Sequence, residues 1–388
     1  MSVSRNLIFV TGTRADFGKL KPLIRAVENS PDFESSLFVT GMHTLGRYGY
    51  TVDEVYKAFG EHRLSEGFRS IYTFMNQVPG EAMDRVLANT IQGLSHYVQE
   101  FRPDMIVVHG DRVEALAGAI VGALRNIRVA HIEGGELSGT IDELVRHSIT
   151  KLSHVHFVAN EEAARRLRQL GELRESVFVI GSPDIDVMLS SDLPSIEEVR
   201  DHYGIGFERW AVVILHPVTT DPEGTASCVK QMVDALLASE GNFVLIHPNN
   251  DEGCDAIFDE YTRLEGHARF LLFPSMRMEA FLTLLKHCDF ILGNSSAGIR
   301  EAPVYGVPTV NIAARQSNRF EHESIVNVEG VKDAIQVGIR EATSRGRHEP
   351  CYHFGDGRSA GRFLEALTGP LLWEVPEQKQ FVDVPLAD

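Results

Sequence analysis

The sequence predicts an α/β protein built from two doubly wound domains, and three observations support this. The chain has 388 residues, more than the ~100–150 typical of one domain. Short apolar runs alternate with helix-length periodic segments, which is typical of parallel strands covered on both faces. The pattern breaks at the Ser-, Asp- and Pro-rich stretch 182–195 and then restarts. We therefore expect Rossmann-like domains over 1–185 and 186–370, facing across a cleft, and a tail over 371–388.

Six apolar runs in the first domain are expected as strands, and many of them end in Gly, Asn, His or Ser: 7–12, 36–41, 105–110, 129–135, 155–160 and 177–181. Met83 to Phe101 carries apolar residues on one side at helical spacing and is expected as a helix. Right-handed crossovers through such helices would join the strands into a parallel sheet.

The second domain is expected to repeat this architecture without repeating the sequence. Its strands are predicted at 211–217, 243–250, 270–275, 290–296 and 308–312. Ligands of such folds bind at the carboxyl ends of the strands, so the functional residues are expected there.

Composition excludes several classes of function. Asp and Glu number 54 against 37 Lys and Arg, a net charge of −17, which disfavours nucleic acid or an anionic membrane as the partner. The cysteines form no CxxC pair, so zinc ribbons and dithiol redox motifs are not expected. His154 and His156 have no third ligand at a suitable spacing, so no metal site is predicted. With no apolar run of membrane-spanning length and no signal peptide, we expect a cytoplasmic protein.

The segment GTRADFGKL (12–20) places a Gly-rich turn between the first strand and a helix. It fails as a P-loop because five residues separate Gly12 from Gly18 and Leu20 replaces the Ser or Thr that would hold magnesium. A helix N-terminus still attracts phosphate, and Arg14 adds a positive charge. The alternative is a tight turn with a solvated arginine.

Three acids follow predicted strands of the first domain. Asp111 lies in VVHGDRVEAL, Glu133 ends a strand, and Asp142 shares a helix face with Arg146, four residues away. Asp111 could instead cap a helix, and Asp142 could simply favour its first turn. If the acids converge, their repulsion would raise the pKa of at least one, which could then act as a proton donor or base.

The second domain offers its own candidates. His216 ends the first strand in LHPVTTD, where it is expected to be either structural or a catalytic or phosphate-contacting group. Ser295, Ser296 and Gly298 are expected to open a helix that would seat an anion, with Glu301 about two turns along and suited to ribose hydroxyls. The alternative is a capped structural helix. No GxGxxG fingerprint supports a bound nicotinamide, and GNSSAG is not the GxSxG of hydrolases.

Together these segments resemble a known family. TGTRADFGKL, VVHGDRVEAL, HIEGGELSGTIDELVRHSITKLSH, LHPVTTD and GNSSAGIREAP occur in the order seen in hydrolysing UDP-N-acetylglucosamine 2-epimerases, in the branch that feeds sialic and legionaminic acid synthesis. The resemblance spans residue 7 to about 320. It implies a glycosyltransferase-B-like fold, an active site in the interdomain cleft and no cofactor or bound metal. It also implies a C-terminal helix, here 359–368, that crosses back onto the first domain.

The resemblance also implies residue roles. Asp111, Glu133 and Asp142 match the catalytic acids, His216 matches the catalytic histidine near the diphosphate, and Arg146 matches the arginine that supports the acids. The nucleotide-binding positions match Arg14, Ser295, Ser296 and Glu301. The implied reaction removes the proton at carbon 2, expels the nucleoside diphosphate, and hydrates the resulting glycal to a free 2-epimeric sugar.

The substrate is a UDP- or GDP-linked N-acetylamino sugar under this interpretation. The segment 40–57, and the chain generally, most resemble the legionaminic-type enzymes, and this resemblance favours a 2,4-diacetamido-2,4,6-trideoxy sugar over UDP-N-acetylglucosamine. The family suggests a homodimer or homotetramer. A glycosyltransferase of the same fold and a non-catalytic nucleotide-sugar binder are the alternatives.

Overall fold

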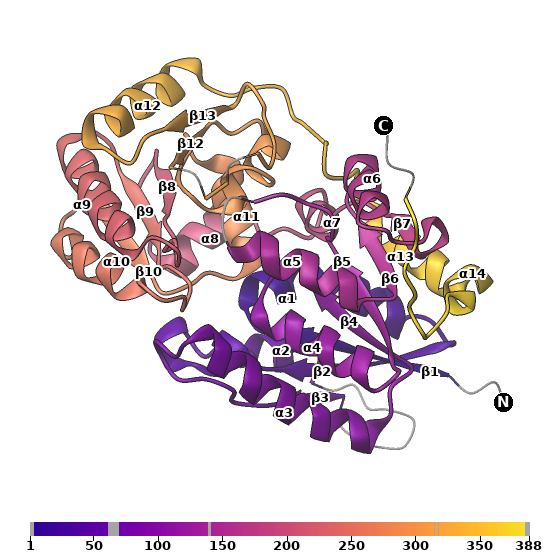
Figure 1. The fold of residues 1–388 in the computed structure, drawn as a ribbon. Coiled ribbons are helices and arrows are strands. Elements are labelled where there is room, and N and C mark those ends of the chain that lie inside the picture. The colour runs from indigo at the N-terminus through magenta and orange to yellow at the C-terminus, as the bar shows by residue number, and fades with distance from the viewer. Residues whose placement is uncertain (1–3, 61–69, 139–140, 314, 317, 385–388) are drawn as a thin grey trace. The chain divides into compact units, whose positions relative to one another are not determined.

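The computed structural model describes residues 4–60, 70–138, 141–313, 315–316 and 318–384. The chain divides into two compact units, each an α/β sheet flanked by helices (Figure 1). Unit 1 comprises Met1–Glu136, Asp142–Leu189 and Phe354–Asp388, and unit 2 comprises Leu137–Ile141 and Ser190–His353. The predicted fold class of two parallel-sheet α/β domains is confirmed.

The unit 1 sheet has the strand order β3-β2-β1-β4-β5-β6-β7, and its pairings are parallel throughout the described residues. Its strands are β1 Arg5–Thr11, β2 Phe33–Val39, β3 Ile71–Thr73, β4 Met105–His109, β5 Arg128–Ile132, β6 Val155–Val158 and β7 Val177–Val179. The order reverses beside β1, so the carboxyl ends of β1 and β4 lie at a switch point of the topology.

The unit 1 helices are α1 Arg14–Glu28, α2 Val52–Phe59, α3 Met83–Phe101, α4 Val113–Leu124, α5 Ile141–Leu152, α6 Glu161–Gln169, α7 Pro183–Met188, α13 Ser359–Thr368 and α14 Pro370–Glu374. The helix expected from Met83 to Phe101 therefore has the bounds of α3. Short 3-10 helices lie at Gly41–Thr44, Gly46–Tyr48 and Arg174–Ser176.

The unit 2 sheet has the order β10-β9-β8-β11-β12-β13, again parallel throughout the described residues. Its strands are β8 Ala211–Ile214, β9 Phe243–Ile246, β10 Phe270–Phe273, β11 Ile291–Gly293, β12 Thr309–Ile312 and β13 Ile325–Val328. Its α-helices are α8 Ile196–Tyr203, α9 Pro222–Ala238, α10 Cys254–Tyr261, α11 Met278–His287 and α12 Lys332–Arg345. Its 3-10 helices are Thr262–Leu264, Ser296–Gly298 and Ala302–Tyr305.

Two edge strands, β3 and β13, were missed in the sequence. Both are short, and β13 has no fully buried residue, so neither shows the continuous apolar run of a central strand. The central strands were found because they are buried on both faces. In β4, for example, the four residues from Met105 to Val108 are fully buried.

The helix predicted at 359–368 is α13, and it packs against α1 and α7 within unit 1. Phe363 and Leu367 are fully buried in the unit 1 core. Asp186 of α7 fixes the start of α13, because its carboxylate accepts hydrogen bonds from the Ser359 amide at 2.9 Å and the Ala360 amide at 2.8 Å. Such capping satisfies amides that have no partner inside the helix. None of the helices in the described residues is long and apolar enough to cross a membrane.

Candidate active site

Asp111, which follows β4, lies against a buried arginine of α5, the helix that follows β5. Gly110 follows β4 with φ +73°, a conformation that glycine adopts without strain, and turns the chain so that Asp111 meets α5. Arg146 of α5 is 1% exposed and forms an ion pair with the Asp111 carboxylate. The Arg146 guanidinium also donates to the Glu136 carbonyl at 3.0 Å. The predicted support of Asp111 by Arg146 is thus a direct contact.

Further acids surround the same guanidinium. Burial alone would lower the pKa of Arg146, but the carboxylates of Asp111, Glu136 and Asp142 raise it above the ordinary arginine value. These three acids therefore share one cation. The repulsion argued from the acids in the sequence is opposed by this buried positive charge.

Glu133 occupies a second, more enclosed network. It follows β5 with φ +65°, unusual for a residue with a side chain, and is 5% exposed. The His109 ring lies 3.0 Å from one carboxylate oxygen, and the Ser182 hydroxyl donates to the other. The Lys19 ammonium lies 3.9 Å from the same carboxylate and 3.0 Å from the buried Asp184. Glu133 is held on several sides, whereas 27% of the Asp111 side chain is exposed.

Most of the residues that hold Glu133 were not identified from the sequence. Lys19 belongs to the segment rejected as a P-loop, and Ser182 and Asp184 lie in the stretch where the strand pattern was expected to break. Residues 183–188 of this stretch form α7, a helix for which the sequence analysis made no prediction, and Asp184 is fully buried. The Ser-, Asp- and Pro-rich composition reflects a helix start, where proline and acids are favoured, as well as a domain boundary.

Arg14 begins α1 at the carboxyl end of β1. A capping box between Thr13 and Asp16 fixes the helix start, and Arg14 pairs with Glu54 of α2 with 17% of its side chain exposed. The Arg14 guanidinium is therefore fixed by an ion pair, and it is not the solvated arginine of the alternative interpretation.

In unit 2, His216 follows β8 and is oriented by two asparagines. The Asn249 backbone N–H donates to Nδ1 of His216 at 3.2 Å, which leaves the proton of the neutral ring on Nε2. The Asn294 side chain accepts from the His216 amide at 2.7 Å and donates to the His216 carbonyl at 2.8 Å. The carboxyl ends of β8 and β11 are thus joined, and the imidazole presents Nε2–H.

The helix expected after β11 is two short 3-10 helices instead, so that local prediction was wrong. The first spans Ser296–Gly298 and the second Ala302–Tyr305, with Glu301 between them and 3% exposed. The Ser295 hydroxyl accepts from the Ala297 amide at 3.3 Å. Pro303 has no N–H to donate to a preceding carbonyl, which prevents one continuous α-helix. An anion bound here would be held by the backbone amides of these short turns and not by the dipole of a long helix.

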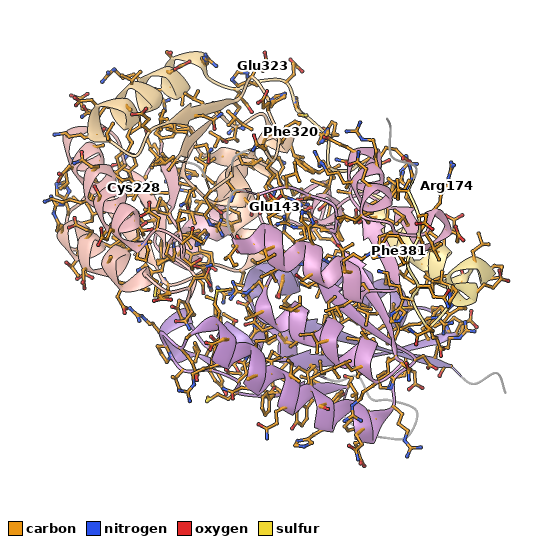
Figure 2. The ribbon with its side chains drawn as sticks, viewed as in Figure 1. Glu143, Arg174, Cys228, Phe320, Glu323 and Phe381 are labelled. Carbon is orange, nitrogen blue, oxygen red and sulfur yellow. The ribbon has the colours of Figure 1, made fainter. Side chains whose placement is uncertain are left out.

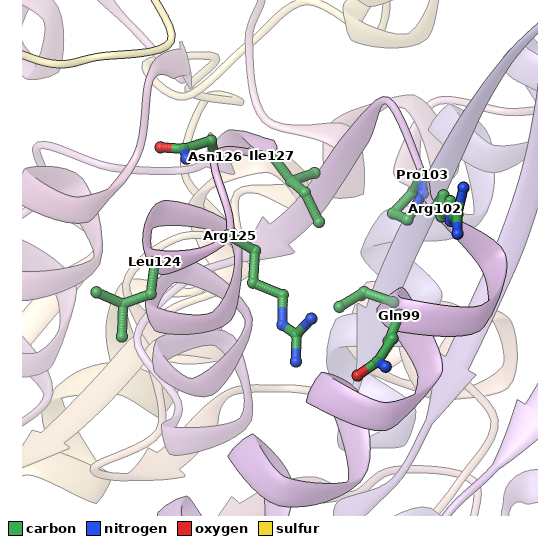
Figure 3. Close-up of a pocket in the computed structure, with 8 residues that line it drawn as sticks. Gln99, Arg102, Pro103, Leu124, Arg125, Asn126 and Ile127 are labelled. Carbon is green, nitrogen blue, oxygen red and sulfur yellow. The ribbon is translucent and has the colours of Figure 1, made fainter.

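Unit 1 has a separate pocket at the amino ends of its strands, the opposite edge of the sheet from Asp111 and Glu133 (Figure 3). It has a volume of about 800 Å³ and is lined by Val98, Gln99, Arg102, Pro103, Leu124, Arg125, Asn126 and Ile127. Pro103 and Ile127 precede β4 and β5, whereas Asp111 and Glu133 follow them. The lining contains no carboxylate that could act as a base. Among the described residues, none of the clusters of His, Cys, Asp and Glu is suited to hold a metal ion.

Comparisons with known proteins identify the family of the chain. Residues 25–368 match the sequence profile of the family described as UDP-N-acetylglucosamine 2-epimerase. The chain belongs to this family. It is 48% identical to a UDP-N-acetylglucosamine 2-epimerase of Neisseria meningitidis serogroup B, over 98% of this chain and 100% of that one. It is 32% identical to a hydrolysing UDP-N,N'-diacetylbacillosamine 2-epimerase of Legionella pneumophila, over 94% and 95% of the two chains.

The epimerase fold is also seen in solved structures. The UDP-GlcNAc 2-epimerase of Methanocaldococcus jannaschii, in complex with UDP-GlcNAc and UDP, superimposes with a TM-score of 0.79. The alignment covers 94% of this chain and 99% of that one at 21% identity, which shows the shared fold. The resemblance seen in the sequence motifs is therefore confirmed at the level of the family.

Proposed function

We propose that this family member is a hydrolysing epimerase that converts UDP-N-acetylglucosamine and water into UDP and free N-acetylmannosamine. The observation that carries the proposal is Asp111, a partly exposed carboxylate held by the buried Arg146, while Glu133, which follows the neighbouring strand, is enclosed. A weakly acidic C–H proton needs a close, fixed base, and the arginine fixes Asp111 in one orientation. We assign Asp111 to direct contact with the sugar because Glu133 is largely enclosed.

The reaction balances in two steps. A carboxylate takes the proton from carbon 2 while the bond from carbon 1 to the diphosphate breaks and UDP leaves, giving a 2-acetamidoglycal. Water then adds its oxygen at carbon 1, and a proton returns to the opposite face of carbon 2. The second step needs one acid and one base, which supports roles for Glu133 and Asp142 beside Asp111.

The nucleotide half of the substrate needs positive charge and donors. We assign the diphosphate to Arg14, to Nε2–H of His216 and to the amides around Ser295, Ser296 and Gly298, since such groups stabilise a departing dianion. We assign the ribose hydroxyls to the carboxylate of Glu301, following the family resemblance.

The choice of sugar rests on the relatives. The sequence motifs favoured the diacetamido sugar, but the relative at 48% identity is named for UDP-N-acetylglucosamine and the one at 32% for the diacetylbacillosamine derivative. We therefore place UDP-N-acetylglucosamine first. The diacetamido sugar is the second candidate because the Legionella relative, which carries that name, aligns over nearly the whole chain.

Incubation in deuterated water tests the proposal. The enzyme would be given UDP-N-acetylglucosamine and, separately, UDP- and GDP-linked diacetamidobacillosamine. We expect release of UDP and a free 2-epimeric sugar with one deuterium at carbon 2. A product still linked to UDP would show a non-hydrolysing epimerase, and transfer to an added acceptor without deuterium would show a glycosyltransferase.

A further inference from the structure

The C-terminal tail, residues 375–384, is anchored to the end of α5, the helix that carries Asp142 and Arg146. The Lys379 ammonium donates to the carbonyls of Thr150 at 3.0 Å and Ser153 at 2.7 Å. The last carbonyls of a helix have no partner within it, and a cation there also interacts favourably with the helix dipole. Lys379 therefore acts as a C-terminal cap supplied by a segment more than 220 residues away in sequence.

Lys379 is also one partner of a buried ion pair. Its ammonium contacts Glu172, whose side chain is 1% exposed and which also accepts from Nε2 of His156 at 3.0 Å and from Lys151 at 2.8 Å. Burial alone would raise the pKa of Glu172, but the His156 hydrogen bond and the charge of Lys379 hold it at about 2. Burial lowers the pKa of Lys379, so desolvation of the ammonium offsets part of what the pair contributes.

A chain of hydrogen bonds connects this cap to Asp111. The Thr150 hydroxyl lies 3.1 Å from Nδ1 of His131, and Nε2 of His131 lies 2.8 Å from the Gly110 carbonyl. A carbonyl can only accept, so Nε2 donates and Nδ1 accepts from the Thr150 hydroxyl. Burial lowers the pKa of His131 to about 3, which keeps this tautomer neutral. Gly110 immediately precedes Asp111, and Asp111 pairs with Arg146 on α5.

We propose that Lys379 is a positioning residue for the reaction, which fixes α5 along its axis and thereby keeps Arg146 aligned with Asp111. This inference rests on the proposed function of the Asp111 site. An axial shift of α5 by a fraction of an ångström would move the guanidinium relative to the carboxylate, and small misplacements of reacting groups are costly.

The tail has other anchors, so removal of the ammonium does not detach it. Arg128 donates to the Val375 carbonyl at 3.2 Å and pairs with Glu377 at 2.9 Å. Nε2 of His154 lies 2.8 Å from the Glu377 carbonyl. Beyond Lys379 the chain reaches Phe381, labelled in Figure 2, a residue that is 88% exposed. Lys379 is thus an inward-pointing residue on a tail that is already held in place.

A cavity beside Lys379 makes the proposal testable by chemical rescue. It has a volume of about 610 Å³ and lies between the tail and residues 171–176, with Lys379, Glu172 and His154 in its lining. A small alkylammonium ion fits such a space and can replace the lost side chain next to Glu172.

The test compares Lys379→Ala with Gln380→Ala, an exposed neighbour on the same tail. We expect kcat to fall about tenfold in K379A with KM within about twofold, because misalignment affects the chemical step more than nucleotide binding. Added n-butylammonium should restore at least half of the lost kcat in K379A and leave Q380A unchanged. An unchanged kcat in K379A, a defect confined to KM, or a lost kcat that the amine does not restore would overturn the inference.

A double-mutant cycle tests the route. Thr150→Val removes the hydroxyl that bonds His131 but keeps the shape and the carbonyl that accepts from Lys379. If both residues act through one chain, K379A/T150V should lose no more kcat than the worse single variant. Multiplicative losses would show independent effects and contradict the route.

Hydrogen exchange provides a readout that needs no turnover. In K379A, amides of residues 105–111 and 141–153 should exchange faster than in the wild type, while unit 2 amides stay unchanged. Unchanged exchange in both segments overturns the inference. A protein that turns over none of the sugars but shows the expected exchange would refute the proposed function and leave the link from Lys379 to Asp111 in place.

Discussion

At the residue scale, the two carboxylates that follow β4 and β5 have different surroundings. Asp111 is partly exposed and paired with Arg146, whereas Glu133 is enclosed by His109, Ser182 and Lys19. The sequence predicted Asp111 and Glu133 as a set because each follows a strand. It could not predict their separate partners, since Lys19 and Ser182 come from distant parts of the chain.

Asp111→Asn should reduce turnover at least ~10²-fold, because an amide cannot accept the carbon 2 proton. UDP affinity, measured by calorimetry, should stay within a few-fold, since the nucleotide is assigned to other residues. Asp259→Asn, at an exposed position of α10, is the control and should behave as wild type. Retained turnover in D111N would exclude Asp111 as the base, and tighter binding without any turnover in the wild type would favour a non-catalytic binder.

Gly41→Ala should lower the free energy of unfolding by about 2 kcal/mol, since strained backbone positions cost about 1–3 kcal/mol. Gly41 has φ +64°, and an added Cβ would lie 2.4 Å from the Gly12 carbonyl oxygen and 2.7 Å from the Glu114 carboxylate. Gly46→Ala is the matched control in the same segment, because nothing lies within 4 Å of its added Cβ. Urea denaturation measures both, and equal stability of the two variants would contradict the steric argument.

At the element scale, side-chain caps fix the residue at which a helix begins, and at α1 this sets the position of Arg14. Thr13 and Asp16 form a capping box at the start of α1 and flank Arg14, the first residue of that helix, and Ser195 and Glu198 form the same capping box at α8 in unit 2. The segment after β11 shows the opposite outcome, because Pro303 replaces an expected helix with short 3-10 turns.

Thr13→Ala and Ser195→Ala should each lower the free energy of unfolding by about 1 kcal/mol, because each removes one capping box. Only T13A should also weaken UDP binding, since it loosens the turn that carries Arg14. Thermal unfolding and UDP titration on the two variants separate these effects. Equal loss of UDP affinity in both would argue against a role for Arg14 at the phosphate.

At the scale of the whole molecule, each unit is a parallel sheet whose central strands are apolar and whose polar groups gather after the strand ends. Buried imidazoles belong to this framework in unit 1. Burial lowers the pKa of His43 to about 4 and that of His131 to about 3, and each ring bonds a threonine hydroxyl. These histidines stay neutral in the folded state at pH values where the unfolded chain takes up protons.

Stability should therefore fall on acidification. A histidine with a lowered folded pKa contributes fully above its unfolded pKa of about 6.5 and loses that contribution as the pH falls below it. Each such histidine should cost about 1.4 kcal/mol between pH 7.5 and pH 5.5. Urea unfolding followed by Trp373 fluorescence in a Trp210→Phe background measures this in unit 1. His43→Asn should reduce the change in the free energy of unfolding between these pH values by about 1.4 kcal/mol. His202→Asn, at an exposed site of unit 2, should leave that change as it is in the wild type.

The sequence by itself determined the two-sheet α/β architecture, most central strands and the segments that carry the family motifs, because apolar periodicity and turn residues act over a few neighbouring positions. Only the tertiary structure decided that Arg146 is buried against Asp111, that residues 183–188 form a helix whose Asp184 contacts Lys19, and that Lys379 caps α5. These contacts join residues far apart in the chain. Their energies depend on shared burial and charge, which a local pattern does not encode.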